Sequence, residues 1–328
     1  MPTPFDTEAK QIIRSQWSKP LLKFLHDTLN AKLIYLGLPS KDPLDIYEWI
    51  DYLEEVYAFQ CREYDLPSEE NQSREVVLEL EKKLRDLEKE NQLSYSMVYD
   101  GYIEEVVLRG FDNNPQPIVF EQDNTVTVYN LDFCNKITFP ITYEQDGQTK
   151  TAYKFEVIKE LLRYQKQVKE LPKKFLFFLT VRATFKGNHL KDIVKNSFEK
   201  YYKKVSILSK KESEARLVKA YIFKILSGAF HYNNFKAEFL PVIRYQGGGN
   251  SKPELLHFTI LGTQSGSTSG GIIPIQNPDT FLKKKFITPE ENKFILQNNE
   301  KIDETNSTLE SLTCFKRSKT VKKIWKTI

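Results

Sequence analysis

Residues 125–141 (TVTVYNLDFCNKITFPI) place polar side chains at the end of an apolar run. β-Branched and aromatic residues lead into Asn130, Asp132, Phe133 and Cys134. A buried strand that ends in an amide, a carboxylate and a thiol delivers polar groups to a cleft. There, Asn130 and Asp132 could orient a substrate nucleophile or accept its proton, and Phe133 could stack on a planar group. Alternatively, Asp132 caps the following segment and Phe133 belongs to the core.

Cys134 could act as a nucleophile only with a base nearby and a lowered thiol pKa. None of the four histidines, at positions 26, 189, 231 and 257, lies in a Cys–His family signature. A structural thiol is therefore the favoured interpretation. The histidines also lack the i, i+4 spacing of metal ligands, and the cysteines at 61, 134 and 314 lack metal-ligand spacing. We expect no metal site.

The elements that position these residues alternate along the chain. The expected strands are residues 32–40, 56–61, 95–101, 125–133 and 173–185. The expected helices are 6–30 with a break near Pro20, 42–55, 68–92, 153–168 and the helical stretch 190–231. Two further strands, 235–246 and 254–263, are joined by GGGNSKP, which suits a hairpin loop better than a phosphate-binding loop because no helix follows it.

Alternating strands and helices with fully apolar strands predict an α/β fold: a Rossmann-like, mainly parallel sheet with helices on both faces and a C-terminal antiparallel strand pair. Ligands in such sheets bind beyond the carboxyl ends of the strands, near the point where the strand order reverses. The polar residues that end the expected strands should converge on that edge. They are Ser40, Gln60, Asp100, Asn130 and Asp132.

The order of elements over residues 32–263 resembles the Rossmann-like S-adenosylmethionine-dependent methyltransferases. In that family a glycine-rich turn after the first strand approaches the cofactor. The matching stretch here, YLGLPSKDPLDI, contributes Gly37, Ser40 and Asp45. The resemblance implies S-adenosylmethionine as the cofactor.

The later strand ends carry further positions of the family pattern. The family's second strand ends in an acid that holds the ribose, and VYAFQCRE offers Gln60 and Cys61 there, with Glu63 a residue or two later as the alternative. Asp100 matches the position near the adenine, and Phe133 is a candidate to stack on a planar group. Asn130 and Asp132 match in type the Asp or Asn beside the methyl-transfer site.

Two departures leave the activity open. Leu38 and Pro39 stand where the family has glycines. Their side chains limit how closely the backbone of the turn can approach the cofactor. The missing ribose acid removes charge-assisted hydrogen bonds to the diol. One hypothesis is therefore a methyltransferase that acts on a macromolecule, such as nucleic acid. The alternative is a catalytically degenerate subunit that serves as a binding or scaffold component of a multi-protein complex, with a defence system as an analogy.

Charge is segregated along the chain. Residues 40–123 hold 22 Asp and Glu against 8 Lys and Arg, whereas residues 150–224 hold 20 Lys and Arg against 7 Asp and Glu. The basic part interleaves lysines with Tyr201, Tyr202 and Tyr221, a mixture compatible with nucleic-acid contact. The candidate contacts are Lys203, Lys204, Lys210 and Lys211. The alternative is that these runs are solvated helix faces.

We expect three parts: a helical segment at 1–31, the Rossmann-like domain at 32–271 and a basic extension at 272–328. The last stretch, 316–328, is a candidate docking segment for a protein partner, because Ile324 and Trp325 lie among lysines. No apolar run approaches the ~20 residues that span a bilayer. The N-terminus lacks the layout of a signal peptide, and a cytoplasmic location is expected.

Overall fold

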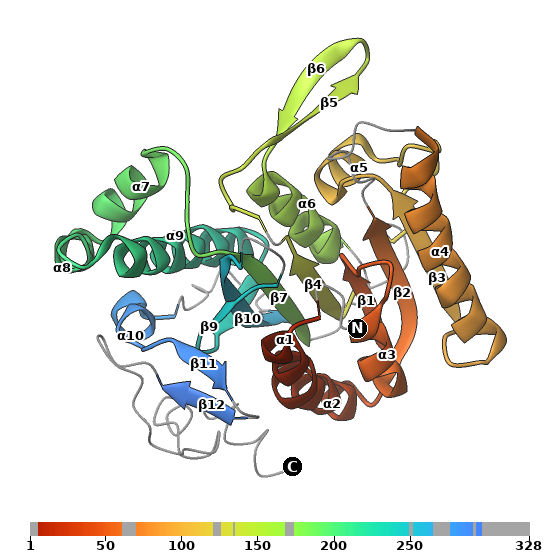
Figure 1. Ribbon diagram of the computed structural model, residues 1–328, viewed down its shortest axis with the longest axis horizontal. Helices are drawn as coiled ribbons and strands as arrows, with labels where there is room; N and C mark the ends of the chain where they lie inside the picture. Colours follow the sequence, from red (N-terminus) through yellow and green to blue (C-terminus); the bar gives the residue numbers. More distant parts are fainter. Residues whose placement is uncertain are drawn as a thin grey trace.

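A ten-stranded sheet organises the computed structural model, which describes residues 6–60, 70–120, 126–133, 135–167, 174–248, 252–264, 276–290 and 293–296 (Figure 1). Five strands are parallel, in the spatial order β3-β2-β1-β4-β7. They are β1 (Leu33–Gly37), β2 (Leu53–Gln60), β3 (Tyr95–Asp100), β4 (Val128–Asp132) and β7 (Lys174–Arg182). The chain moves outward from β1 to β3 and then crosses to β4, so the strand order reverses between β1 and β4.

The other half of the sheet is mainly antiparallel. β10 (Glu254–Gln264) lies antiparallel to β7 and pairs on its far side with β8 (Phe235–Phe239) and β9 (Ile243–Gln246). β11 (Ile287–Glu290) and β12 (Lys293–Leu296) extend the edge beyond β9. This arrangement confirms the predicted α/β fold class, a mainly parallel half of the sheet followed by antiparallel C-terminal strands.

Helices cover both faces, which is why the central strands are apolar throughout. The N-terminal face is covered by α1 (Glu8–Ile12), the π-helix η1 (Ile13–Ser18), α2 (Lys19–Leu29), α3 (Leu44–Trp49) and α4 (Glu70–Lys89). The opposite face is covered by α5 (Ile103–Arg109), α6 (Lys154–Gln167) and α9 (Lys210–Tyr232). Successive residues of β7 alternate between the two cores, Phe177 facing α9 and Phe178 facing the N-terminal helices.

The expected elements differ from the observed ones where proline or a neighbouring strand intervenes. The break near Pro20 takes the form of the π-helical turn η1 just before it. The helix expected at 42–55 ends at Trp49, and a 3₁₀ turn (η2, Ile50–Tyr52) leads into β2. The strand expected at 235–246 is divided into β8 and β9 around Pro241, whose nitrogen has no proton to donate to a ladder. The basic stretch 190–231 forms α7 (His189–Ser197), α8 (Glu199–Val205) and α9.

Two features were not predicted. Helix α5 follows β3, and a hairpin of β5 (Ile141–Gln145) and β6 (Gln148–Ala152) projects from the body between β4 and α6 (Figure 1). The hairpin turn is Asp146–Gly147, with φ of +55° and +70°. Asp-Gly is a strong signal for this turn, because both central residues need positive φ.

Part of the expected C-terminal extension belongs to the sheet. Over residues 276–290 and 293–296 the chain forms α10 (Pro278–Leu282), β11 and β12. Phe281 and Phe286 pack in the α9 core, and Ile287 packs in the N-terminal core. The candidate docking segment 316–328 lies outside the described residues. No helix within the described ranges is long and apolar enough to cross a membrane.

At Gly37, strands β1 and β4 lie too close together to leave room for a side chain. A Cβ there would lie 2.4 Å from the Tyr35 hydroxyl and 2.6 Å from the Asn130 carbonyl oxygen. Gly37→Ala should therefore lower the free energy of unfolding by about 1–3 kcal/mol, as overpacking does. Gly228→Ala, in α9, meets nothing within 4 Å and should raise it by about 0.5–1 kcal/mol. Urea titrations of both variants test this, and equal stabilities would contradict it.

Candidate functional site

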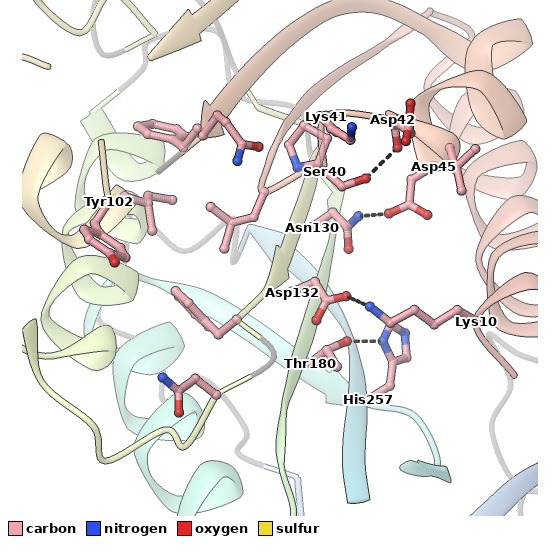
Figure 2. A pocket seen from close by; sticks show the side chains of 18 of the residues that line it. Lys10, Ser40, Lys41, Asp42, Asp45, Tyr102, Asn130, Asp132, Thr180 and His257 are labelled. Atoms are coloured by element: carbon pink, nitrogen blue, oxygen red, sulfur yellow. Dashed lines mark hydrogen bonds and ion pairs between the residues drawn. The ribbon is translucent and has the colours of Figure 1, made fainter. Parts of the chain in front are cut away.

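A cavity of about 710 Å³ lies at the carboxyl ends of β1, β2, β4 and β7 (Figure 2). It sits at the reversal of strand order, where sheets of this kind bind ligands. Six of the predicted site residues line it: Ser40, Asp45, Gln60, Asn130, Asp132 and Phe133. The strand-end pattern therefore led to one shared cavity. Cys134 lies outside the described residues.

Gly37 and Asp100 are not among the lining residues. Gly37 is buried between strands, where its missing Cβ makes room for the Tyr35 hydroxyl. Asp100 is fully buried, and its backbone N–H donates to the carboxylate of Asp112 in the loop after β3. In their place the cavity wall holds the neighbouring residues Leu38 and Gly101. The structure gives Gly37 and Asp100 packing and loop-ordering contacts.

Asn130 links β4 to the loop and helix that follow β1. Its Nδ2 donates to Asp45 Oδ2 at 2.8 Å and lies 3.3 Å from the Tyr35 hydroxyl. Asp45, in the first turn of α3, also accepts from Arg14 Nε at 2.5 Å. Asn130 is buried, so the amide is held in one orientation by these partners. Its orientation therefore depends on Asp45 and on the cation that Asp45 binds.

The N-terminal helices bring two cations to the cavity that the sequence did not reveal. Arg14 of η1 pairs with Asp45, and Lys10 of α1 pairs with Asp132 at 2.6 Å (Figure 2). Trp49 Nε1 donates to the Arg14 carbonyl at 3.1 Å, which fixes η1 against α3. Asp132 at the end of β4 and Asp45 in the first turn of α3 are thus each neutralised by a cation from the N-terminal helices.

Starting from Asp132, the partner of Lys10, a row of polar side chains crosses three neighbouring strands. Asp132 on β4 is paired in register with Thr180 on β7, and Thr180 with His257 on β10. The Thr180 hydroxyl and His257 Nδ1 are 2.9 Å apart (Figure 2). Burial lowers the pKa of His257 to about 4, against the smaller opposing effects of Asp132 and Asp45. The imidazole is therefore neutral at pH 7.

The other side of the cavity is formed by elements on the α6 face. Lys154 Nζ lies 3.3 Å from Glu104 Oε1, in a pair that is 4% exposed on each side, and it donates to the Phe139 carbonyl. The same Nζ lies 5.3 Å from the centre of the Phe133 ring. Tyr102, on the loop before α5, also lines this side. This side of the cavity is therefore lined by the aromatic rings of Phe133 and Tyr102 and by a buried ion pair.

The arrangement is built for an uncharged or zwitterionic ligand. Asp45, Asp132 and Glu104 each have a cation beside them, so no large net field of one sign remains. Polar atoms at the strand ends alternate with aromatic walls, as in small-molecule sites. Within the described residues no group of three or more His, Cys, Asp or Glu could hold a metal ion.

The candidate nucleic-acid residues lie on α8 and at the start of α9. Lys203, Lys204, Lys210 and Lys211 are all exposed. Lys203 pairs with Glu199 at 2.6 Å and Lys211 with Glu254 at 3.2 Å. The tyrosines of this stretch do not offer free faces to bases. Tyr221 is buried against Phe155, and Tyr201 and Tyr202 pack against the core.

Fold and cavity together define a Rossmann-like α/β protein with a cavity at the reversal of its strand order. A protein-family model described as PP_RS20740-like matches residues 4–232. The chain belongs to the PP_RS20740-like family. No curated protein matches it.

The comparison with solved structures found methyltransferases at low TM-score and low sequence identity. An O-methyltransferase from Bacillus cereus in complex with SAH has a TM-score of 0.38 and 8% identity, over 79% of this chain and 84% of that chain. TomG from Streptomyces achromogenes, an O-methyltransferase in complex with SAM, has a TM-score of 0.37 and 9% identity, over 79% of this chain and 91% of that chain. A SAM-dependent methyltransferase from Methanosarcina mazei has a TM-score of 0.36 and 10% identity, over 74% of this chain and 96% of that chain. Similarity at this level says nothing about substrate.

The buried imidazole makes stability depend on pH. His257 has an ordinary pKa of 6.5 and a folded value of about 4, with Lys10, Asp132 and Asp45 as its charged neighbours. Between these values the unfolded chain binds the proton and the folded chain does not, so stability falls as pH falls from 6.5 to 4. The loss from this group should reach about 3 kcal/mol. Comparing denaturant unfolding of wild type and His257→Phe across this range isolates it, and parallel pH curves would contradict it.

Proposed function

We propose that this protein binds S-adenosylmethionine in the cavity at the carboxyl ends of β1, β2 and β4 and transfers its methyl group to an acceptor. The observation that carries the proposal is the convergence of Asp45, Gln60, Asn130 and Asp132 on one cavity at the strand-order reversal. That is the location the methyltransferase-type fold uses for its ligand.

The residues present fit the parts of this cofactor. Phe133 and Tyr102 offer aromatic faces to the adenine. The Gln60 amide, at the end of β2, can both donate to and accept from the ribose hydroxyls. Asp45 and Arg14 carry the charges that complement an α-ammonium and an α-carboxylate. The donor set therefore matches a nucleoside joined to a zwitterionic amino acid.

The turn after β1 binds its ligand differently from a glycine-rich turn. The Leu38 N–H donates to the Asn130 carbonyl at 3.1 Å, and Pro39 has no N–H. Neither backbone group is therefore offered to a carboxylate. In the proposed complex Arg14 and Lys10 supply the positive charge instead, from the N-terminal helices.

When bound, the cofactor supplies an electrophilic methyl group on a sulfonium. Positioning the acceptor in line with that methyl supplies much of the rate, so little acid–base help is needed from the protein. Asn130 and Asp132, held by Asp45 and Lys10, would orient the acceptor. The aromatic and apolar walls would exclude water.

The acceptor that we propose is part of a macromolecule, and nucleic acid is the class that α8 and α9 favour. Their exposed lysines can neutralise phosphates without reading sequence. Because the neighbouring tyrosines are packed inward, the contact would rest on charge and not on base stacking. It should accordingly weaken steeply with salt.

A second candidate is a catalytically degenerate methyltransferase fold that acts as a scaffold subunit. The observation in its favour is that Lys10 and Arg14 already pair with two carboxylates of the cavity wall, Asp132 and Asp45. A cavity closed by such pairs could serve to hold the N-terminal helices in place for a partner. Cofactor titration separates the two candidates.

Calorimetric titration of the full chain with S-adenosylmethionine and with S-adenosylhomocysteine should show binding to both. Ser40→Trp places a large side chain in the exposed cavity wall and should weaken both by at least tenfold, about 1.4 kcal/mol. Ser206→Trp, exposed at the end of α8, is the matched control and should change neither. No heat from a folded wild-type chain would reject cofactor binding and leave the scaffold role.

Charge reversal on the basic helices tests the nucleic-acid proposal. Lys204→Glu with Lys210→Glu should weaken binding of a labelled single-stranded oligonucleotide. Each lost phosphate contact should reduce the slope of log K against log salt by about 0.7. Lys82→Glu with Lys89→Glu on α4 makes the same charge change on an exposed acidic helix and should have little effect. Fluorescence anisotropy at several salt concentrations measures both pairs, and equal losses would overturn a specific surface.

A further inference from the structure

His257 carries a buried polar atom that the fold leaves without a partner. Its ring is 5% exposed, Nδ1 is bonded to Thr180, and Nε2 has no hydrogen-bond partner. Such an atom costs stability unless something pairs with it. The described residues contain three others, in Ser227, Arg244 and Thr288. Among these four residues, His257 is the one that lines the cavity.

The imidazole is held in a fixed orientation. The Phe178 ring stacks on it with centroids 5.6 Å apart and an interplanar angle of 22°. Thr180 binds the opposite ring nitrogen, and the backbone of β10 is held between β7 and β9. Packing against Phe178 and the bond to Thr180 therefore fix the direction in which Nε2 points. The ring is thus held in one orientation, with Nε2 buried in a residue that lines the cavity.

The surroundings of this nitrogen are electrically balanced. Lys10 is paired with Asp132 and Arg14 with Asp45, and burial holds the His257 pKa low enough for a neutral ring at pH 7. Apolar and aromatic side chains line the same cavity. They include Ile13, Trp49 and Tyr245. Beside Nε2 a charged group would lose its hydration without gaining a counter-charge, because Lys10 and Asp132 already pair with each other there.

We propose that His257 Nε2 binds an uncharged hydroxyl group, and that this end of the cavity, with Asp132 and Thr180, is the methyl-acceptor subsite. Its role as an acceptor subsite rests on the proposed function, whereas the binding of a hydroxyl does not. A hydroxyl both donates and accepts, so it satisfies Nε2 in either tautomer of the ring. A carboxylate can only accept and an ammonium can only donate.

The test uses phenol as the uncharged probe, with benzoate and benzylamine as charged counterparts of similar size. In a ¹⁵N-histidine spectrum of the full chain, the His257 signals are those missing from His257→Phe. Phenol should shift the Nε2 signal, and its affinity should fall at least tenfold in His257→Phe. Thr180→Val, which releases Nδ1, should weaken phenol binding as well. Benzoate and benzylamine should leave the signal in place.

Folding of the variants is checked by thermal unfolding. His257→Phe removes the unpaired nitrogen and should melt at or above the wild-type temperature. His257→Gln, which keeps a polar side chain, serves as the second variant should the phenyl ring fail to fit. A phenol affinity unchanged in both variants, or equal binding of benzoate or benzylamine, would overturn the assignment.

The two proposals fail separately. If phenol shifts His257 but S-adenosylhomocysteine gives no heat, the hydroxyl site stands and the methyltransferase proposal is rejected. If S-adenosylhomocysteine binds but phenol leaves the His257 signals unchanged at saturating concentration, cofactor binding stands and the subsite is rejected. Phenol affinity that rises when S-adenosylhomocysteine is present would support an acceptor site beside the cofactor.

Discussion

The close approach of β1 and β4 at Gly37 is the constraint on which the site depends. Because Gly37 has no side chain, the Tyr35 hydroxyl can lie against the Asn130 side chain. Asn130 in turn bonds Asp45, and Asp45 bonds Arg14. Hydrogen bonds thus connect β1 and β4, through Asp45 in the first turn of α3, to Arg14 in the N-terminal helices. Any atom added at Gly37 would disturb the orientation of the amide at the centre of the cavity.

Much of the fold follows from local pattern, and the site follows only in part. The parallel strands were predictable because both their faces are buried, which leaves an uninterrupted apolar run such as residues 173–185. Polar residues at the carboxyl ends of parallel strands share one edge, so Asn130, Asp132 and Gln60 were found together. Gly37 was expected at the cofactor because it matches the family's glycine-rich turn, and the structure places it where a Cβ would meet the Tyr35 hydroxyl and the Asn130 carbonyl.

What sequence could not provide were the partners that arrive from distant elements. Lys10 and Asp132 are 122 positions apart, and only the docking of α1 brings them together. Thr180 and His257 meet because β10 runs antiparallel to β7 in one register, which no local pattern specifies. One signal was present: His257 interrupts the apolar run of ELLHFTILG, and a polar residue in the middle of a buried strand indicates a specific partner. The Asp-Gly turn of the β5–β6 hairpin was a second signal of this kind.

The turn after β1 and the N-terminal cations are physically related. A glycine-rich turn binds an anionic group with backbone N–H groups, and here the Leu38 N–H is committed to Asn130 while Pro39 has none. A cation from outside the sheet can replace those donors, provided that it is held rigidly. The Trp49 indole fixes η1 by donating to the Arg14 carbonyl, and the Trp17 indole donates to Thr259 on β10 at 2.8 Å. The N-terminal helices are therefore attached to both halves of the sheet, and their cations are placed over the cavity as firmly as a turn of the sheet itself would be. Removing these helices would take away Lys10 and Arg14 together with one wall of the cavity.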